Sequence, residues 1–347
     1  RRDKLIERKH AEIGRQREAE QLEEDFVRRL DAALDDHIGD DLLRLIFTAC
    51  HPVLSTEART ALTLRLLGGL TTDEIARAFV VPEPTIAQRI VRAKRTLTEK
   101  KVPFEVPRGA ELNERLASVL EVIYLIFNEG YTATVGDDWM RPGLCEEALR
   151  LGRILAELAP SEPEVHGLVS LMEIQASRAR ARVGPNGQPI LLLDQNRARW
   201  DQLLIRRGLA ALERAQRLSG AVGPYTLQAA IAACHARART ADETEWVRIA
   251  SLYGVLAQLT PSPIIELNRA VAVSMAQGPA EALKIIDDLV THGALKNYHL
   301  LPTVRGDLLF KLNRFAEAKE EFERAAALTR NTRERDLLLE RAKACVR

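Results

Sequence analysis

Apolar and polar residues recur at helical spacing on both sides of a tight turn in the first third of the chain. Residues 72–79 begin with a threonine and two acidic residues, a favourable helix start, and place their apolar residues on one face. Pro82 ends this helix because proline lacks the N–H and clashes with the preceding turn. Pro84 suits the first turn of a second helix, residues 84–97. Its apolar stripe consists of Ile86, Ile90, Val91 and Leu97.

The free face of this second helix is basic. Between Pro84 and Lys101 there are six cations and one anion, Glu99, which gives a net charge of +5. The cations are Arg89, Arg92, Lys94, Arg95, Lys100 and Lys101. A short helix pair whose second member is basic is the helix-turn-helix arrangement that reads the major groove of DNA. A basic face is also common on helices that are only solvated, so this pattern alone leaves both interpretations open.

Helical patterns continue through the rest of the chain, and no long alternating run predicts a strand. Residues 40–51 and 55–67 predict two helices, ended by Pro52 and by Gly68-Gly69. From about residue 110 one helix follows another, separated by turns that contain glycine or proline. The sequence therefore predicts an all-α protein in which a helix-turn-helix region precedes a helical repeat domain.

The last two helix pairs carry a repeat with an offset of 36 residues. Ala270, Ala282 and Ile286 in one pair match Gly306, Ala318 and Phe322 in the next. Small residues at the first two positions let paired helices approach closely, and the large third residue fills the gap between them. The internal spacings of 12 and 4 are typical of the tetratricopeptide pattern.

These observations predict three segments. Residues 1–36 form a charged helical linker, residues 37–102 a helix-turn-helix domain, and residues 103–347 a tetratricopeptide-like helical extension. Pro103 and Pro107 mark the boundary between the last two.

Charge is segregated along the chain although the net charge is only +1. Residues 1–17 carry +4, residues 18–41 carry −8, residues 42–102 carry +5, and residues 103–347 are neutral. A nucleic-acid-binding surface is therefore expected in the first third only. The acidic run is either a solvated helix or a segment that screens the basic helix within the same molecule.

Few residues suggest chemistry. The four cysteines are scattered without C-x-x-C pairing, which favours buried thiols in a reducing cytoplasm over disulfides or zinc. The seven histidines show no nucleophile or paired-carboxylate arrangement, and no glycine-rich phosphate loop occurs. We expect no metal, no cofactor and no enzyme activity, and no apolar run is long enough to span a membrane.

The segment LLRLIFTACHPVLSTEARTALTLRLLGGLTTDEIARAFVVPEPTIAQRIVRAKRTL resembles region 4 of extracytoplasmic-function (ECF) bacterial sigma factors. Further resemblance lies in VPFEVP, VIYLIFNEGYTAT, RWDQLLIRRGLAALERA, GPYTLQAAIAACHA and PSPIIELNRAVAV. Together these segments resemble the subgroup with a C-terminal tetratricopeptide-like extension. The resemblance implies a fragment of an alternative sigma factor that directs transcription initiation; without region 2, this polypeptide alone is expected to bind −35 DNA weakly and not to initiate transcription.

This resemblance also implies roles for individual residues. Region 4 of such factors recognises the promoter −35 element and packs on the flap of core RNA polymerase, so the recognition helix here is residues 84–97. Its N-terminal half places Thr85, Gln88 and Arg89 to meet base edges, where Arg and Gln make bidentate contacts. The remaining cations, Arg92, Lys94, Arg95 and Lys100, suit phosphate contacts. The family's region 2 does not occur in this sequence, and Pro82 stands where family members often have a serine-like cap.

The motif Asn128-Glu129-Gly130-Tyr131 has two interpretations. A Glu and a Tyr beside a Gly suit a regulatory ligand pocket. More often such residues end a helix, here at Gly130, and hold a domain junction together.

Two alternative functions remain open. One is a helix-turn-helix regulator that senses a peptide or small ligand with its repeat domain and never joins polymerase. The other is a repeat scaffold whose basic helix is only a solvated face. In the sigma-factor interpretation, the repeat domain regulates activity in cis, and its surface offers a place for a protein partner or ligand.

Overall fold

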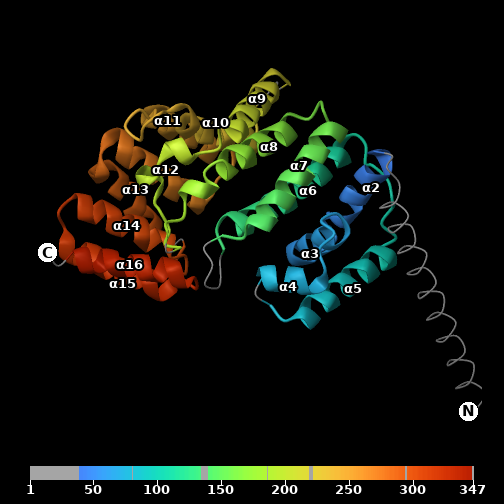
Figure 1. Cartoon of the computed structure of the whole chain (residues 1–347), viewed down its shortest axis with the longest axis horizontal. Helices are drawn as coiled ribbons and strands as arrows, with labels where there is room; N and C mark the ends of the chain where they lie inside the picture. Colours follow the sequence, from blue (N-terminus) through green and yellow to red (C-terminus); the bar gives the residue numbers. More distant parts are fainter. Residues whose placement is uncertain are drawn as a thin grey trace, which may run out of the picture. The chain divides into compact units, whose positions relative to one another are not determined.

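A computed structural model describes residues 39–79, 81–133, 140–185, 187–218, 222–293 and 295–345 of the chain. The chain divides into two compact units, residues 1–126 (unit 1) and residues 127–347 (unit 2). Within the described ranges every regular element is a helix (Figure 1), apart from one isolated β-bridge. The predicted all-α fold is therefore confirmed. The predicted linker over residues 1–36 lies outside the described residues.

Unit 1 is built from short helices and the beginning of a long one. They are α2 (Gly39–Ala49), α3 (Thr56–Leu66), α4 (Thr72–Phe79), α5 (Glu83–Glu99) and α6 (Ala110–Tyr131). The start of α3 is capped as its sequence predicts, because the Ser55 hydroxyl accepts a hydrogen bond from the Ala58 amide at 3.3 Å. After α3 the chain turns at Gly69, whose φ of 65° is a left-handed value that glycine adopts without strain.

The first turns of α6 pack on unit 1 through buried polar side chains. Arg115, only 2% exposed, donates to the Phe47 carbonyl near the end of α2 at 3.0 Å. The Ser118 hydroxyl donates to the Cys50 carbonyl at 2.5 Å and accepts from Arg59 of α3. These bonds satisfy carbonyls that the end of α2 leaves without helical partners.

This packing bears on the predicted boundary at residues 102 and 103. The structure divides its packing units between Ile126 and Phe127, inside the continuous helix α6. The helix-turn-helix domain over 37–102 and the extension over 103–347 stay a prediction about domains. As a matter of packing, the first part of α6 belongs to unit 1.

Unit 2 continues with helices throughout its described length. They are α7 (Pro142–Leu158), α8 (Pro163–Ala176), η1 (Ala179–Ala181), η2 (Leu192–Asp194), η3 (Arg197–Arg199), α9 (Gln202–Leu218), α10 (Pro224–Arg237), α11 (Trp246–Leu259), α12 (Pro263–Gln277), α13 (Pro279–Thr291), α14 (Leu300–Lys311), α15 (Phe315–Leu328) and α16 (Thr332–Ala344). Consecutive helices pack on each other from α10 to α16.

The helix pairs α12–α13 and α14–α15 contain the two predicted repeats. Every matched side chain is in the core: Ala270, Ala282, Ile286, Ala318 and Phe322 are at most 1% exposed. A Cβ atom placed on Gly306 would lie 2.9 Å from the Phe322 ring, so glycine is needed for this close approach. The small–small–large pattern therefore packs as its spacing predicts, while the tetratricopeptide relationship stays a prediction.

The contribution of α6 to unit 1 is testable by removing Arg115. In Arg115→Ala the Phe47 carbonyl loses its buried donor, so we expect unit 1 to lose about 1–3 kcal/mol of stability. Hydrogen–deuterium exchange should show faster exchange of the α2 and α3 amides. Arg108→Ala removes an exposed arginine from the same connection and should leave exchange unchanged. Equal effects of the two variants would contradict the packing role of Arg115.

Candidate nucleic-acid interface

The first helix of the helix-turn-helix is held by a capping box one residue earlier than the predicted start suggests. The Thr71 amide and hydroxyl donate to Glu74 Oε2 at 2.8 and 2.9 Å, and the Glu74 amide donates to the Thr71 hydroxyl at 3.2 Å. These hydrogen bonds from Thr71 lower the pKa of Glu74. Helix α4 does begin at Thr72, but Thr71 is the residue that caps it.

The turn between α4 and α5 is short and its proline cap is unusual. The Val81 amide donates to the Ala76 carbonyl at 3.0 Å, which closes α4. Pro82 then occupies the N-cap of α5 in an extended conformation, with no side-chain cap hydrogen bond, and Pro84 lies in the first turn. The Thr72 hydroxyl donates to Glu83 Oε1 at 3.0 Å and joins the starts of the two helices.

Burial of one face of α5 decides which residues face solvent. Ile86, Ile90, Ala93 and Leu97 are at most 7% exposed and pack against α3 and α4. Val91, which the apolar stripe includes in the sequence prediction, is 57% exposed. That part of the prediction is wrong, because residue 91 lies about 100° around the helix from Ile90 and off the buried stripe.

The seven predicted DNA-contact residues divide into exposed and flanking positions. Gln88, Arg92, Arg95 and Lys100 are exposed, whereas Thr85, Arg89 and Lys94 are half-buried at the edges of the packed face. Arg95 also pairs with Glu99 at 2.7 Å, and both side chains remain more than half exposed. The structure thus places all seven on α5 or its C-cap.

Arg89 lies on the flank nearest α3. The pKa of Glu57 in α3 is lowered, chiefly by hydrogen bonds from its own amide and from the Ser55 hydroxyl, with a smaller contribution from the positive charges of Arg89 and Arg59. Arg89 is half-buried and Arg92 is exposed, and neither makes an ion pair with the described residues.

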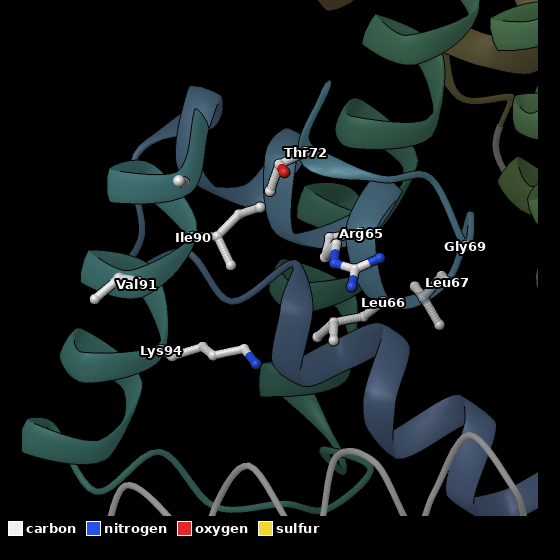
Figure 2. A pocket seen from close by; sticks show the side chains of 9 residues that line it. Arg65, Leu66, Leu67, Gly69, Thr72, Ile90, Val91 and Lys94 are labelled. Atoms are coloured by element: carbon white, nitrogen blue, oxygen red, sulfur yellow. The ribbon is translucent and has the colours of Figure 1, made fainter. Parts of the chain in front are cut away.

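A hollow of about 520 Å³ opens on the opposite flank of α5 (Figure 2). Leu66, Leu67, Ile90 and Val91 supply apolar wall, and Arg65 and Lys94 supply positive charge. Lys94 extends from α5 toward the side on which Arg65 lies. Sequence patterns give no sign of this hollow, because it forms between the end of α3, the following loop and α5.

The predicted junction motif at the end of α6 is held within unit 2. Glu129 accepts a hydrogen bond from Arg141, and the Arg141 amide donates to the Gly130 carbonyl at 2.7 Å. The Arg182 guanidinium lies 3.4 Å from the centroid of the Tyr131 ring, and Arg178 donates to the Tyr131 hydroxyl at 2.6 Å. Asn128 is exposed. These contacts support the structural interpretation of the motif.

The predicted helix end at Gly130 lies one residue before the observed end of α6, at Tyr131. Gly130 lies within α6 with an ordinary helical backbone, since its φ is not positive. A Cβ atom at Gly130 would meet the Cys145 amide nitrogen at 2.6 Å and Leu144 Cβ at 2.9 Å. Glycine is needed here so that the start of α7 can approach α6.

The cysteines and possible metal ligands give no sign of chemistry among the described residues. All four thiols are buried and unpaired, and burial raises the pKa of Cys50 to about 11 and that of Cys145 to about 12. In the part of the chain that the structure covers, no three His, Cys, Asp or Glu residues come together as metal ligands. No described helix is long and apolar enough to cross a membrane.

Comparison with known proteins finds two matching families and two similar proteins. Residues 44–97 match the family described as Sigma-70, region 4, and residues 115–216 match a family of unknown function (DUF6596). The uncharacterised protein R00370 of Rhizobium meliloti is 45% identical over 312 residues, which are 90% of this chain and 72% of that protein. The ECF RNA polymerase sigma-E factor of Haemophilus influenzae is 32% identical over 78 residues, 22% of this chain and 41% of that protein.

Substitution of Gly130 tests the close contact between α6 and α7. In Gly130→Ala the added methyl group meets backbone that cannot move cheaply, so we expect unit 2 to lose about 1–3 kcal/mol of stability. Gly143→Ala is the matched control in α7, because no heavy atom lies within 4 Å of its added methyl group. Urea denaturation followed by circular dichroism measures both. If the Gly130→Ala protein is as stable as the control, Gly130 is not needed for the packing of α7 against α6.

Proposed function

The chain belongs to the same family as protein R00370 of Rhizobium meliloti, and we propose that it acts as an alternative, ECF-type sigma factor. In this proposal, region 4 binds the promoter −35 element and the flap of core RNA polymerase, and so directs transcription initiation. The observation that carries the proposal is the exposed basic face of α5 inside a segment that matches sigma-70 region 4.

DNA recognition in this proposal uses the surface of α5 that core packing leaves free. Gln88 and Arg92 lie one helical turn apart on that surface, both exposed, and both side chains make bidentate contacts to base edges. Thr85 and Arg89 lie beside them toward α3. Arg95 and Lys100 lie farther toward the helix end, where phosphate contacts add affinity without sequence choice.

The support for polymerase binding is sequence similarity to a sigma factor. The matched relative from Haemophilus influenzae is described as a sigma factor of RNA polymerase, and its similarity to this chain covers 41% of its length. We assign the flap contact to region 4 as a whole. The proposal requires no catalytic residue and no cofactor, because sigma factors act by non-covalent recognition.

Regulation by the helical unit 2 is the second part of the proposal. Helix α6 runs without a break from Ala110 to Tyr131, so the end of the region 4 packing unit and the start of unit 2 share one helix. A continuous helix transmits a displacement of its end more directly than a flexible linker does. We propose that unit 2 controls region 4 in cis through this helix. A ligand or protein bound to unit 2 is one source of such control.

The DNA-binding proposal is tested first with duplex DNA selected from a random pool by the full chain. Gln88→Ala should cost about 1–3 kcal/mol on the selected duplex and little on random duplex. Arg92→Ala should weaken binding and lower the slope of log affinity against log salt by about 1 if it also contacts phosphate. Fluorescence anisotropy measures both. Arg217→Ala, an equal change of charge in α9 of unit 2, should have no effect.

The sigma-factor part needs a separate measurement. Core RNA polymerase mixed with the protein should retain it in gel filtration, and run-off transcription from selected promoters, measured with this chain joined to a sigma region 2, should depend on Gln88 and Arg92. Salt-dependent DNA binding without polymerase retention, together with dimeric binding to a palindrome, would instead favour the ligand-sensing helix-turn-helix regulator.

A further inference from the structure

The hollow beside α5 combines apolar and basic residues that have no role in the DNA binding proposed above. Its walls include Leu67, which is buried, and Val91, which is 57% exposed, and its volume of about 520 Å³ is that of a binding site for several side chains. Two cations, Arg65 and Lys94, line the same hollow (Figure 2). Apolar walls beside positive charge suit an amphipathic helix with acidic residues.

The two cations of the hollow have no carboxylate partner among the described residues. Arg65 donates to the Leu70 carbonyl at 3.1 Å, and Lys94 makes no ion pair there. Other cations of unit 1 do have carboxylate partners: Arg44 with Asp41, Arg59 with Glu121, Arg77 with Asp73, Arg95 with Glu99 and Arg115 with Glu111. The positive charge of the hollow is therefore available to an acidic ligand.

The chain itself contains a segment of matching chemistry. Residues 18–38 lie outside the described residues, and their sequence carries eight carboxylates and two arginines, a net charge of −6. Leu22, Phe26, Leu30 and Leu34 recur every four residues, the spacing of an apolar helix face. This segment leads directly into α2, which begins at Gly39 and belongs to unit 1.

We propose that residues 18–38 dock in this hollow and restrain region 4 from binding DNA. The apolar face of the segment covers Ile90 and Val91, and its carboxylates lie near Arg65 and Lys94. A helix docked there lies along the flank of α5 that carries Val91 and brings negative charge to the edge of the DNA-facing surface, which opposes the approach of a DNA phosphate backbone. The effect on DNA rests on the proposed function, whereas the docking itself does not.

Tethering favours this segment over an occupant from another molecule. Because the segment is covalently joined to unit 1, its effective concentration at the hollow reaches the millimolar range for a short connection. Even if its apolar and ionic contacts are weak, the segment then occupies the hollow for a substantial fraction of the time. A second copy of the chain would have to compete with this concentration.

Carbodiimide cross-linking of the full chain tests the docking. The reagent joins a lysine amine to a carboxylate in contact with it, and peptide mass spectrometry identifies both residues. We expect Lys94 to link to carboxylates of residues 18–36 several times more often than Lys100, which is the C-cap of the same helix and does not line the hollow. Equal linking of the two lysines, or links from Lys94 mainly to unit 2, would overturn the docking.

Two variants and a labelling control complete the test. Phe26→Ser combined with Leu30→Ser removes the apolar face and should abolish the excess of Lys94 links, while Ala32→Ser, on another face at helical spacing, should not. A mixture of ordinary and ¹⁵N-labelled protein separates links within one chain from links between copies. Links mainly between copies would overturn docking in cis.

DNA affinity then tests the consequence. On the selected duplex, the Phe26→Ser, Leu30→Ser variant should bind about fivefold more tightly than wild type, and Ala32→Ser should match wild type. Unchanged affinity despite loss of the links would overturn the restraint of DNA binding. If neither protein binds duplex DNA at all, the proposed function fails, and the cross-links still decide whether the segment docks.

Discussion

The packing of one face of α5 against α3 and α4 is the constraint on which the functional surface depends. Ile86, Ile90, Ala93 and Leu97 enter the core at helical spacing, and burying each large apolar side chain stabilises the fold by about 1.5–3 kcal/mol. Once that face is committed, the helix period leaves Gln88 and Arg92 facing solvent. The core therefore selects the residues that a DNA duplex can reach, and the same choice creates the hollow on one flank.

Much of region 4 could be predicted from the sequence because local signals decide it. Helix starts, the proline turn and the apolar period all act within a few residues of each other. The prediction failed in two situations. In one, the contact that decides the structure joins residues far apart in the sequence. In the other, two adjacent residues are equally suited to the same role. Thr71 and Thr72 are both good caps, and only the position of Glu74 three residues after Thr71 selects the first. Val91 is apolar, but it is 57% exposed.

The extent of the region 4 packing unit was harder to predict, because its deciding contacts join distant residues. Arg115 and Ser118 have the polarity of surface positions, but their partners are carbonyls at the end of α2, 68 residues earlier. Prolines near residue 103 mark a local break and carry no information about which helix packs where. Gly130 shows the same limit. The sequence pattern places it near a helix end, but only the close approach of α7 shows why glycine is required there.

The cations of unit 1 connect these observations. Most arginines near the core have a carboxylate partner, whereas Arg92 on the DNA-facing surface and Lys94 beside the hollow have none among the described residues. Two ligands that cannot occupy α5 together compete, because binding of one lowers the apparent affinity of the other. If an acidic segment occupies the hollow about 90% of the time and excludes DNA, the apparent DNA affinity falls about tenfold. A modest contact in cis is therefore enough to make promoter binding depend on whatever removes that segment.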